Sequence, residues 1–222
     1  MRFLLPLFLL AVPVEAQPTE GPAARLMEAH RLAALGETAR DPVLLFAAAR
    51  LMQGLQLTET PLSPADPTTS AEPSTEGSAE PTPDPAATVP DPAKAPPLPG
   101  QLSAPALFDA ARALAPEDSA LREAITLAAS EIPPPPALLQ VSLHSQEGSQ
   151  SFALPLPGGS PVQIGLLRLK GALSYSLSAP DGMVLCQDAS TSAASLCTVT
   201  LPESQTLTLT TTGTADWLLA QP

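Results

Sequence analysis

Aromatic side chains are scarce in this sequence of 222 residues, which contains five Phe, one Tyr and one Trp. Because aromatic residues bury the most area per side chain, their scarcity limits the size of any hydrophobic core. The hydrophobic fraction of 44% consists mostly of Ala and Leu. We therefore expect two small cores joined by unstructured chain, which argues against a large enzyme core.

Positive charge is also in short supply, with 10 Lys and Arg against 22 Asp and Glu and a net charge of −12. An acidic chain repels nucleic-acid phosphates. The C-terminal region offers only Arg168 and Lys170 as basic residues, too few for a surface that follows a phosphate backbone. The sequence therefore predicts no nucleic-acid partner.

The usual sets of catalytic residues are missing as well. Only two histidines occur, His30 and His144, and the chain contains no Gly-x-Ser-x-Gly motif. A nucleophilic Ser or Cys needs a neighbouring base to activate it. We interpret His144 as a half-exposed sheet residue and His30 as an ordinary helix residue, so the chain is predicted not to be an enzyme.

Long apolar runs are absent except at the N-terminus, where Phe3–Val14 is hydrophobic. This run is too short to cross a bilayer core of about 30 Å at about 1.5 Å per residue. Small residues stand three and one positions before Gln17, as at a signal-peptidase site. We predict a signal peptide over residues 1–16, cut between Ala16 and Gln17. The mature protein is then periplasmic or extracellular and has no membrane span.

Residues 17–57 and 103–132 show apolar side chains at the spacing of amphipathic helices. Pro22 suits the first turn of a helix, and Asp41 followed by Pro42 suits an N-cap and the position after it. Each region is predicted to form a helical hairpin, and the two hairpins a small bundle. Their similar Ala/Leu/Arg segments fit either a degenerate helical repeat or shared composition alone.

Residues 58–102 contain twelve prolines and no aromatic residue, with seven acidic residues against one lysine. Such a segment cannot bury enough apolar area to offset its conformational entropy. We predict a disordered, acidic, proline-rich linker that divides the two helical hairpins. A spacer, a glycosylated stalk and a tolerated loop insertion all fit this composition.

Over residues 138–222 the apolar pattern changes to a period of two, and Leu173, Tyr175 and Leu177 alternate with serines as in a strand with one wet face. Turn signals interrupt the pattern and include Glu147-Gly148, Lys170-Gly171 and Thr212-Gly213. We predict eight short strands in a β-sandwich or jelly roll. The fold class is therefore α plus β multidomain, a small helical bundle with a disordered insertion and then an all-β sandwich.

The two cysteines, Cys186 and Cys197, lie on two of these predicted strands. In an exported chain an isolated pair of this kind is typical of a disulfide. Zinc is the rival interpretation, but two Cys without a nearby His or a second pair do not complete a tetrahedral site. No metal site is predicted at the cysteines.

The run Leu173–Cys186, with its turn Pro180-Asp181-Gly182, is followed by Cys197–Pro202 and by Thr206–Thr212. This succession resembles the bacterial pre-peptidase C-terminal domain, and the helical regions resemble uncharacterised periplasmic proteins of Gram-negative bacteria. The resemblance implies a jelly-roll β-sandwich attached to exported proteins such as secreted proteases. Many members of the family carry an acidic Asp-x-Asp run on the first of these strands, where this chain has Ser, Tyr and Leu.

Four residues are candidate ligand contacts. Asp181 and Asp188 flank the strand that carries Cys186 and form a candidate Ca²⁺ site, although Ca²⁺ takes about six to eight oxygen ligands. No other cofactor is predicted. Tyr175 and Trp217 are candidates for contact with a sugar, with a position in the core as the alternative for Trp217.

These observations lead to the hypothesis of a non-enzymatic, exported envelope protein whose β-sandwich serves stability or protein interaction. A carbohydrate- or surface-binding module is the alternative, and it requires exposed rings at Tyr175 and Trp217. A third hypothesis is an accessory to a secreted peptidase. The partner is accordingly an unknown envelope protein or a glycan.

Overall fold

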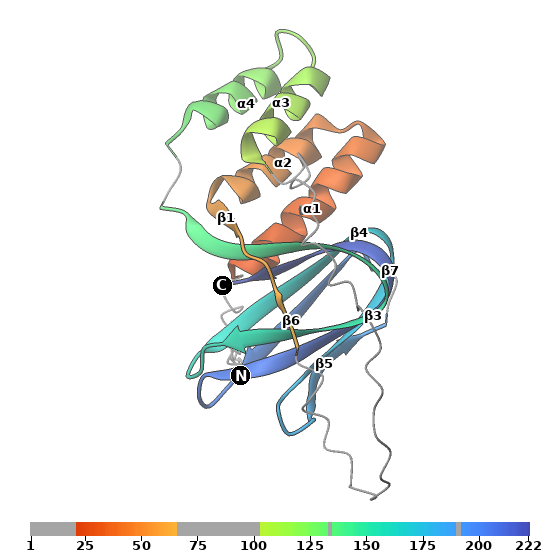
Figure 1. Ribbon diagram of the computed structural model, residues 1–222. Coiled ribbons are helices and arrows are strands. Elements are labelled where there is room, and N and C mark those ends of the chain that lie inside the picture. Colours follow the sequence, from red (N-terminus) through yellow and green to blue (C-terminus); the bar gives the residue numbers. More distant parts are fainter. Residues whose placement is uncertain (1–20, 66–102, 133–134, 190–191) are drawn as a thin grey trace, which may run out of the picture.

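The computed structural model describes residues 21–65, 103–132, 135–189 and 192–222. Four helices and a mixed, seven-stranded sheet make up this part of the chain, and the C-terminal region is β-sandwich-like (Figure 1). The predicted fold class is therefore confirmed. The predicted signal peptide with its cleavage site at Ala16 and Gln17 lies outside the described residues, as do residues 66–102 of the predicted linker.

The first two helices start where the sequence indicates. Helix α1 spans Pro22–Ala39 and α2 spans Pro42–Gln53. A proline opens each helix, where its missing N–H leaves no hydrogen bond unmade. Asp41 caps α2, because its Oδ1 accepts hydrogen bonds from the backbone N–H groups of Val43 at 2.8 Å and Leu44 at 3.4 Å. This cap satisfies two donors that the helix itself leaves free.

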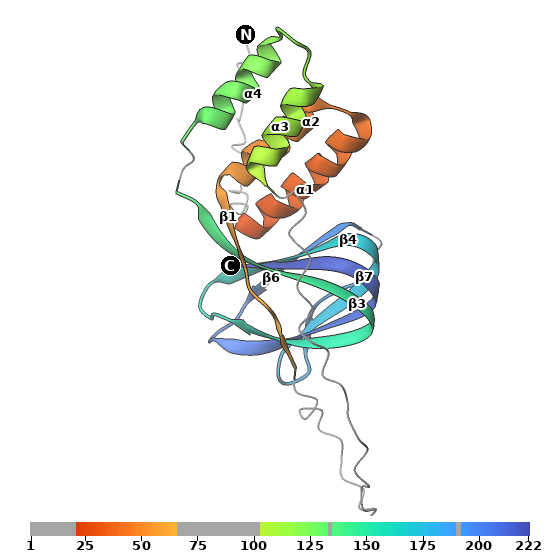
Figure 2. The same cartoon turned by 45° about the horizontal axis from the view of Figure 1, so that its top comes forward.

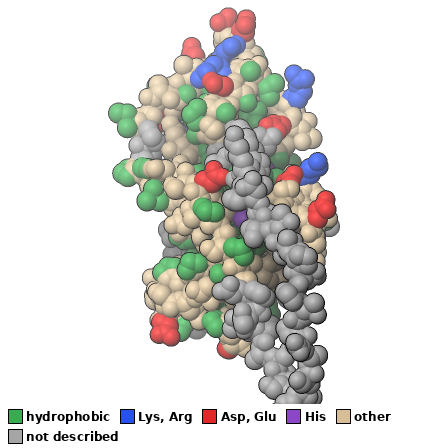
Figure 3. All heavy atoms as spheres, viewed as in Figure 1, with side chains coloured by type: hydrophobic (Ala, Val, Ile, Leu, Met, Phe, Trp, Pro, Cys, Tyr) green, Lys and Arg blue, Asp and Glu red, His purple; other side chains and the backbone are tan. Residues whose placement is uncertain are grey.

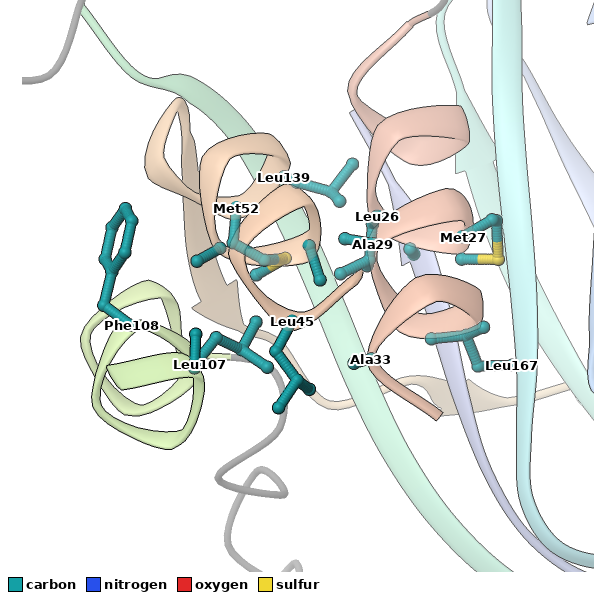
Figure 4. Packing of buried hydrophobic residues seen from close by; sticks show 14 of the residues in the cluster. Leu26, Met27, Ala29, Ala33, Leu45, Met52, Leu107, Phe108, Leu139 and Leu167 are labelled. Atoms are coloured by element: carbon teal, nitrogen blue, oxygen red, sulfur yellow. The ribbon is translucent and has the colours of Figure 1, made fainter. Parts of the chain in front are cut away.

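The second pair of helices continues the same bundle. Helix α3 spans Ala104–Leu114 and α4 spans Ala120–Ser130. Helix α2 lies between α1 and α3, and Leu45 of α2 is fully buried in this stack (Figure 4). Phe46 of α2 faces Phe108 of α3, with ring centroids 6.1 Å apart. None of the described helices is long and apolar enough to cross a membrane.

The first helical pair ends earlier than predicted. After α2, strands β1 (Leu55–Glu59) and β2 (Ser63–Pro64) join the sheet. Strand β1 runs parallel to the start of β3 and β2 runs antiparallel to its second half. The two leucines of β1 pack against the core while their neighbours face outward, which is the period of a strand. The predictions of helix up to residue 57 and of linker from residue 58 are therefore wrong for this stretch.

The remaining strands are β3 (Ala137–Leu156), β4 (Pro161–Ser178), β5 (Val184–Asp188), β6 (Ala194–Thr200) and β7 (Gln205–Gln221). Gly148, Gly171 and Gly213 lie inside β3, β4 and β7 with φ of 88°, 81° and 145°, a region that glycine adopts without strain. A Cβ on Gly171 would lie 2.1 Å from the carbonyl oxygen of Thr214. The predicted turns at these glycines are bends within continuous strands, so the prediction of eight short strands is wrong.

These bends fold one sheet into two layers. The helix-side layer consists of β1, the first half of β3, the second half of β7, the first half of β4, and β6. The outer layer consists of β2, the second half of β3, the first half of β7, the second half of β4, and β5. Figure 2 shows the three long strands curving from one layer into the other at the same end of the sandwich.

The helix-side layer is buried on both faces. Leu167 and Leu218 belong to the core shared with the helices, whereas the adjacent Leu166 and Leu219 belong to the core inside the sandwich. Met27 of α1 points toward the strand that carries Leu167 (Figure 4). Strands with two buried faces are read from sequence as continuous apolar runs. The sheet therefore lies between two cores, one shared with the helices and one inside the sandwich.

Both edges of the sandwich are tied across its two layers. A disulfide between Cys186 and Cys197, whose Cα atoms are 6.2 Å apart, joins β5 of the outer layer to β6 of the helix-side layer, which agrees with the predicted pairing. At the opposite edge the chain itself crosses from β1 to β2, and Thr60 N–H donates to the carbonyl oxygen of Val141 at 2.8 Å.

Replacing both Cys186 and Cys197 with Ala should lower the free energy of unfolding by about 3 kcal/mol, because the unfolded chain gains the entropy of an open loop. For a chain of this size, that corresponds to a melting temperature lower by roughly 6–12 °C. Thermal unfolding followed by circular dichroism measures the shift, with Val184→Ala on the same strand as the control. Equal melting temperatures with and without the disulfide would contradict this role.

Candidate functional site

The two candidate ring contacts, Tyr175 and Trp217, both lie inside the sandwich. Trp217 is fully buried and Tyr175 is 9% exposed. Trp217 Nε1 donates to Gln146 Oε1 at 3.0 Å, and the Tyr175 hydroxyl oxygen lies 3.2 Å from Ser195 Oγ. Both polar atoms are therefore satisfied within the protein, as is usual for buried Tyr and Trp. Neither ring forms an exposed platform for a sugar. Trp217 takes the core position that the sequence offered as its alternative, and Tyr175 joins the same core.

His144 belongs to a cluster of three rings with Trp217 and Phe152. Its centroid is 4.5 Å from that of Trp217 and 4.8 Å from that of Phe152. Burial lowers the pKa of His144 from 6.5 to about 4, because the charged imidazolium loses its water. Its Nε2 atom is buried and has no hydrogen-bond partner within the described residues. The neutral ring packs against both neighbours, and His144 stays partly exposed on β3, as expected for a half-exposed sheet residue.

The candidate calcium ligands, Asp181 and Asp188, do not come together. Asp181 lies in the turn before β5, where its Oδ1 accepts a hydrogen bond from Met183 N–H at 3.0 Å. Asp188 lies at the far end of β5. No group of three or more His, Cys, Asp or Glu residues in the described part of the chain could hold a metal ion. The length of β5 separates the two carboxylates, so the two candidate Ca²⁺ ligands lie at opposite ends of this strand.

Asp188 instead forms a buried ion pair that sequence reasoning missed. Arg168 Nη2 donates to Asp188 Oδ2 at 2.9 Å, and the exposed fractions of the two side chains are 4% and 16%. Arg168 Nε donates to the carbonyl oxygen of Leu173 at 2.8 Å. Arg168 belongs to the helix-side layer and both partners belong to the outer layer. Side chains alternate along a strand, so Arg168 lies on the same inward face as Ile164 and Leu166. This spacing is the sequence signal that could have indicated a buried arginine.

A hollow of about 800 Å³ lies between the helices and β6. We call it the α1–β6 groove, and it is lined by Ala24, Met27, Glu28, Arg31 and Leu32 of α1, Ala47, Arg50 and Leu51 of α2, and Ala194 and Leu196 of β6. Leu196 remains 44% exposed there although it is a large apolar residue. Apolar surface that is exposed in a hollow and bordered by polar residues is characteristic of interaction sites.

Arginines border the α1–β6 groove. Arg31 pairs with Glu28 at 2.6 Å, and its hydrogen bond lowers the pKa of the Glu28 carboxyl. Arg50 pairs with Glu131 of the segment after α4. A second hollow of about 200 Å³ shares Arg50 with the groove and is also lined by Arg25, which has no ion-pair partner within the described residues. In the view of Figure 3 the Lys and Arg side chains lie toward the helical end of the molecule.

The exposed face of the outer layer is covered with hydroxyl groups. Ser149 Oγ lies 3.1 Å from Thr212 Oγ1, and Ser151 Oγ lies 3.1 Å from Thr210 Oγ1. A hollow of about 460 Å³ opens on this face beside β5. The one carboxylate in its lining, that of Asp188, is held by Arg168. This face agrees with the wet strand face expected from the alternating serines and threonines, and it presents no exposed aromatic ring.

A scan against protein-family models and a search of curated proteins found no match. A search of solved structures matched the pre-peptidase C-terminal domain of a collagenase from Bacillus anthracis at 7% sequence identity and a TM-score of 0.31. The match covers 37% of this chain and 87% of that chain. The matched domain has the name of the family that the sequence resembles.

Asp188→Asn should lower the free energy of unfolding by about 3 kcal/mol, because it leaves the Arg168 guanidinium charged, buried and unpaired. Adding Arg168→Met to this variant should restore most of the loss, since the unpaired charge is then removed. Urea unfolding of the single and double variants measures both effects. Asp181→Asn, on the exposed turn at the other end of β5, is the control. A double variant that is less stable than Asp188→Asn would contradict the account.

Acidification should destabilise the fold through His144. Its pKa is about 4 in the folded chain and about 6.5 when unfolded, so the stabilisation is complete above pH 6.5 and is lost as the pH falls toward 4. The slope from this residue is at most about 1.4 kcal/mol per pH unit. Urea unfolding between pH 7 and 4 should show a shallower loss for His144→Phe, which keeps an aromatic ring but cannot be protonated. Parallel curves for the two proteins would exclude this role.

Proposed function

We propose that this chain is an exported, non-enzymatic protein-interaction module that binds a partner through the α1–β6 groove. The groove carries the proposal, because it combines exposed apolar side chains such as Leu196 with arginines at its border. Sites of this composition bind proteins more often than a surface of scattered apolar residues does. Helices α1 and α2 and strand β6 together form the walls of the groove.

Export is supported by the cysteine pair and by the leader-like N-terminal sequence. The disulfide joins the two layers of the sandwich at one edge, and disulfides of this kind persist in oxidising compartments. A non-enzymatic role is supported by His144, whose ring stacks on Trp217, contacts Phe152 and is held neutral by burial.

The carbohydrate-binding alternative loses its main support, because both rings that it requires to be exposed are buried. The role as an accessory to a secreted peptidase stays a prediction. Of these functions, protein interaction is the one that a specific surface of the described chain favours.

The proposal predicts a mature, disulfide-bonded protein outside the cytoplasm that contacts another protein through the groove. A photo-crosslinking amino acid in place of Leu51 should give a discrete adduct in intact cells, whereas the same substitution for Leu127 of α4, which is 66% exposed, should not. Mass spectrometry of the exported fraction should find an N-terminus at Gln17 and oxidised cysteines.

Three results would contradict the proposal. These are a reduced protein that stays in the cytoplasm, equal crosslinking from both positions, and turnover of a hydrolase substrate panel that is abolished by His144→Phe.

A further inference from the structure

Strand β6 has a free edge beside the α1–β6 groove. It pairs only with β4, and no backbone hydrogen bond to its other edge is made by the described residues. Every second residue of such a strand turns its N–H and C=O groups away from the neighbouring strand. An exposed edge of this kind is a template for pairing with another extended chain.

The other edge strands carry features that discourage pairing, and β6 does not. Strand β1 ends in Glu59, and β2 is two residues long and contains Pro64. The pairing of β5 with β4 changes register between Leu177 and Ser178 of β4, and β5 ends in Asp188. Charges, prolines, irregular register and short length all protect edges. The seven residues of β6 contain no charge and no proline, and their register with β4 is continuous.

The side chains of β6 alternate between the sandwich interior and the groove. Cys197 and Val199 belong to the sandwich core, whereas Ala194 and Leu196 line the groove with Met27 of α1. A strand added beside β6 would continue the helix-side layer, so every second side chain would lie over the same hollow. The free edge and the apolar hollow therefore fit one extended ligand.

We propose that the α1–β6 groove binds an extended segment of a second protein, which adds as a strand to the free edge of β6. This inference rests on the proposed interaction function and specifies its ligand. Apolar side chains at alternate positions of the segment fill the hollow around Leu196, and its backbone pairs with β6 over about 20 Å. A helical ligand would leave the backbone groups of β6 unpaired.

The arginines at the border of the groove favour a ligand segment that carries acidic residues next to its apolar ones. Arg25, Arg31 and Arg50 border the two hollows, which share Arg50 and Leu51 in their linings, against the carboxylates of Glu28 and Glu131. Arg25 has no carboxylate partner within the described residues, so a ligand carboxylate would complete its pairing. A second copy of this chain fits less well, because its own β6 contains no acidic residue and each chain carries a net charge of −12.

A random 12-residue peptide library panned against the oxidised protein tests the proposal directly. Enriched peptides should share alternating apolar residues and at least one carboxylate. A synthetic peptide of the consensus should bind Leu196→Lys about tenfold or more weakly than the native protein. It should bind Val184→Lys with unchanged affinity, since Val184 is 51% exposed on the other edge strand, β5. Circular dichroism and melting of both variants verify that they fold.

Hydrogen–deuterium exchange of the unsubstituted protein supplies the second measurement, independent of any variant. Exchange of the β6 amides should slow when the peptide binds. Two versions of the peptide can be made, each N-methylated at every second backbone nitrogen. Only the version whose methyl groups replace the N–H groups that face β6 should lose binding. Absence of enriched peptides, or binding without protection of β6, would overturn strand addition. Self-association that Leu196→Lys removes would assign the edge to a second copy and equally overturn the proposal. Crosslinking from Leu51 in cells would then still stand as evidence for the interaction function.

Discussion

The bend shared by β3, β4 and β7 is the constraint on which the rest of this structure depends. Because these three neighbouring strands turn at adjacent positions, a single sheet supplies both walls of the sandwich. Gly213 makes the requirement plain, since a Cβ there would lie 2.2 Å from the carbonyl oxygen of Ala172. The interior that forms in this way is filled mainly by aliphatic side chains, with Phe152, Tyr175 and Trp217 as its aromatic residues.

Local signals in the sequence predicted much of the secondary structure. Prolines at helix starts, the cap at Asp41 and the alternation around Tyr175 each act over a few residues, and the structure follows them. Three features were missed because they depend on distant partners. Glycine signals do not distinguish a turn from a bend, the pairing of β1 depends on residues about eighty positions away, and the inward side chain of Arg168 needs Asp188 across the sandwich.

The candidate site was harder to predict than the fold. Sequence reasoning proposed rings and carboxylates as contacts, but Trp217 is too large and too apolar to stay outside a core that has so few aromatic residues. The α1–β6 groove is built from ordinary helix-face residues and from Leu196, none of which forms a motif. What distinguishes them is the space left between α1 and an edge strand, and no periodicity in the chain encodes that space.

The burial of the helix-side layer on both faces also bears on how such a chain can evolve. A gene exchange that carried residues 138–222 alone into another protein would leave the leucines around Leu167 and Leu218 facing water, since α1 and α2 would stay behind. The same exchange would remove β1 and β2 from one edge of the sandwich. Residues 138–222 on their own would therefore present an apolar face to water, and the helices are what keeps that face dry.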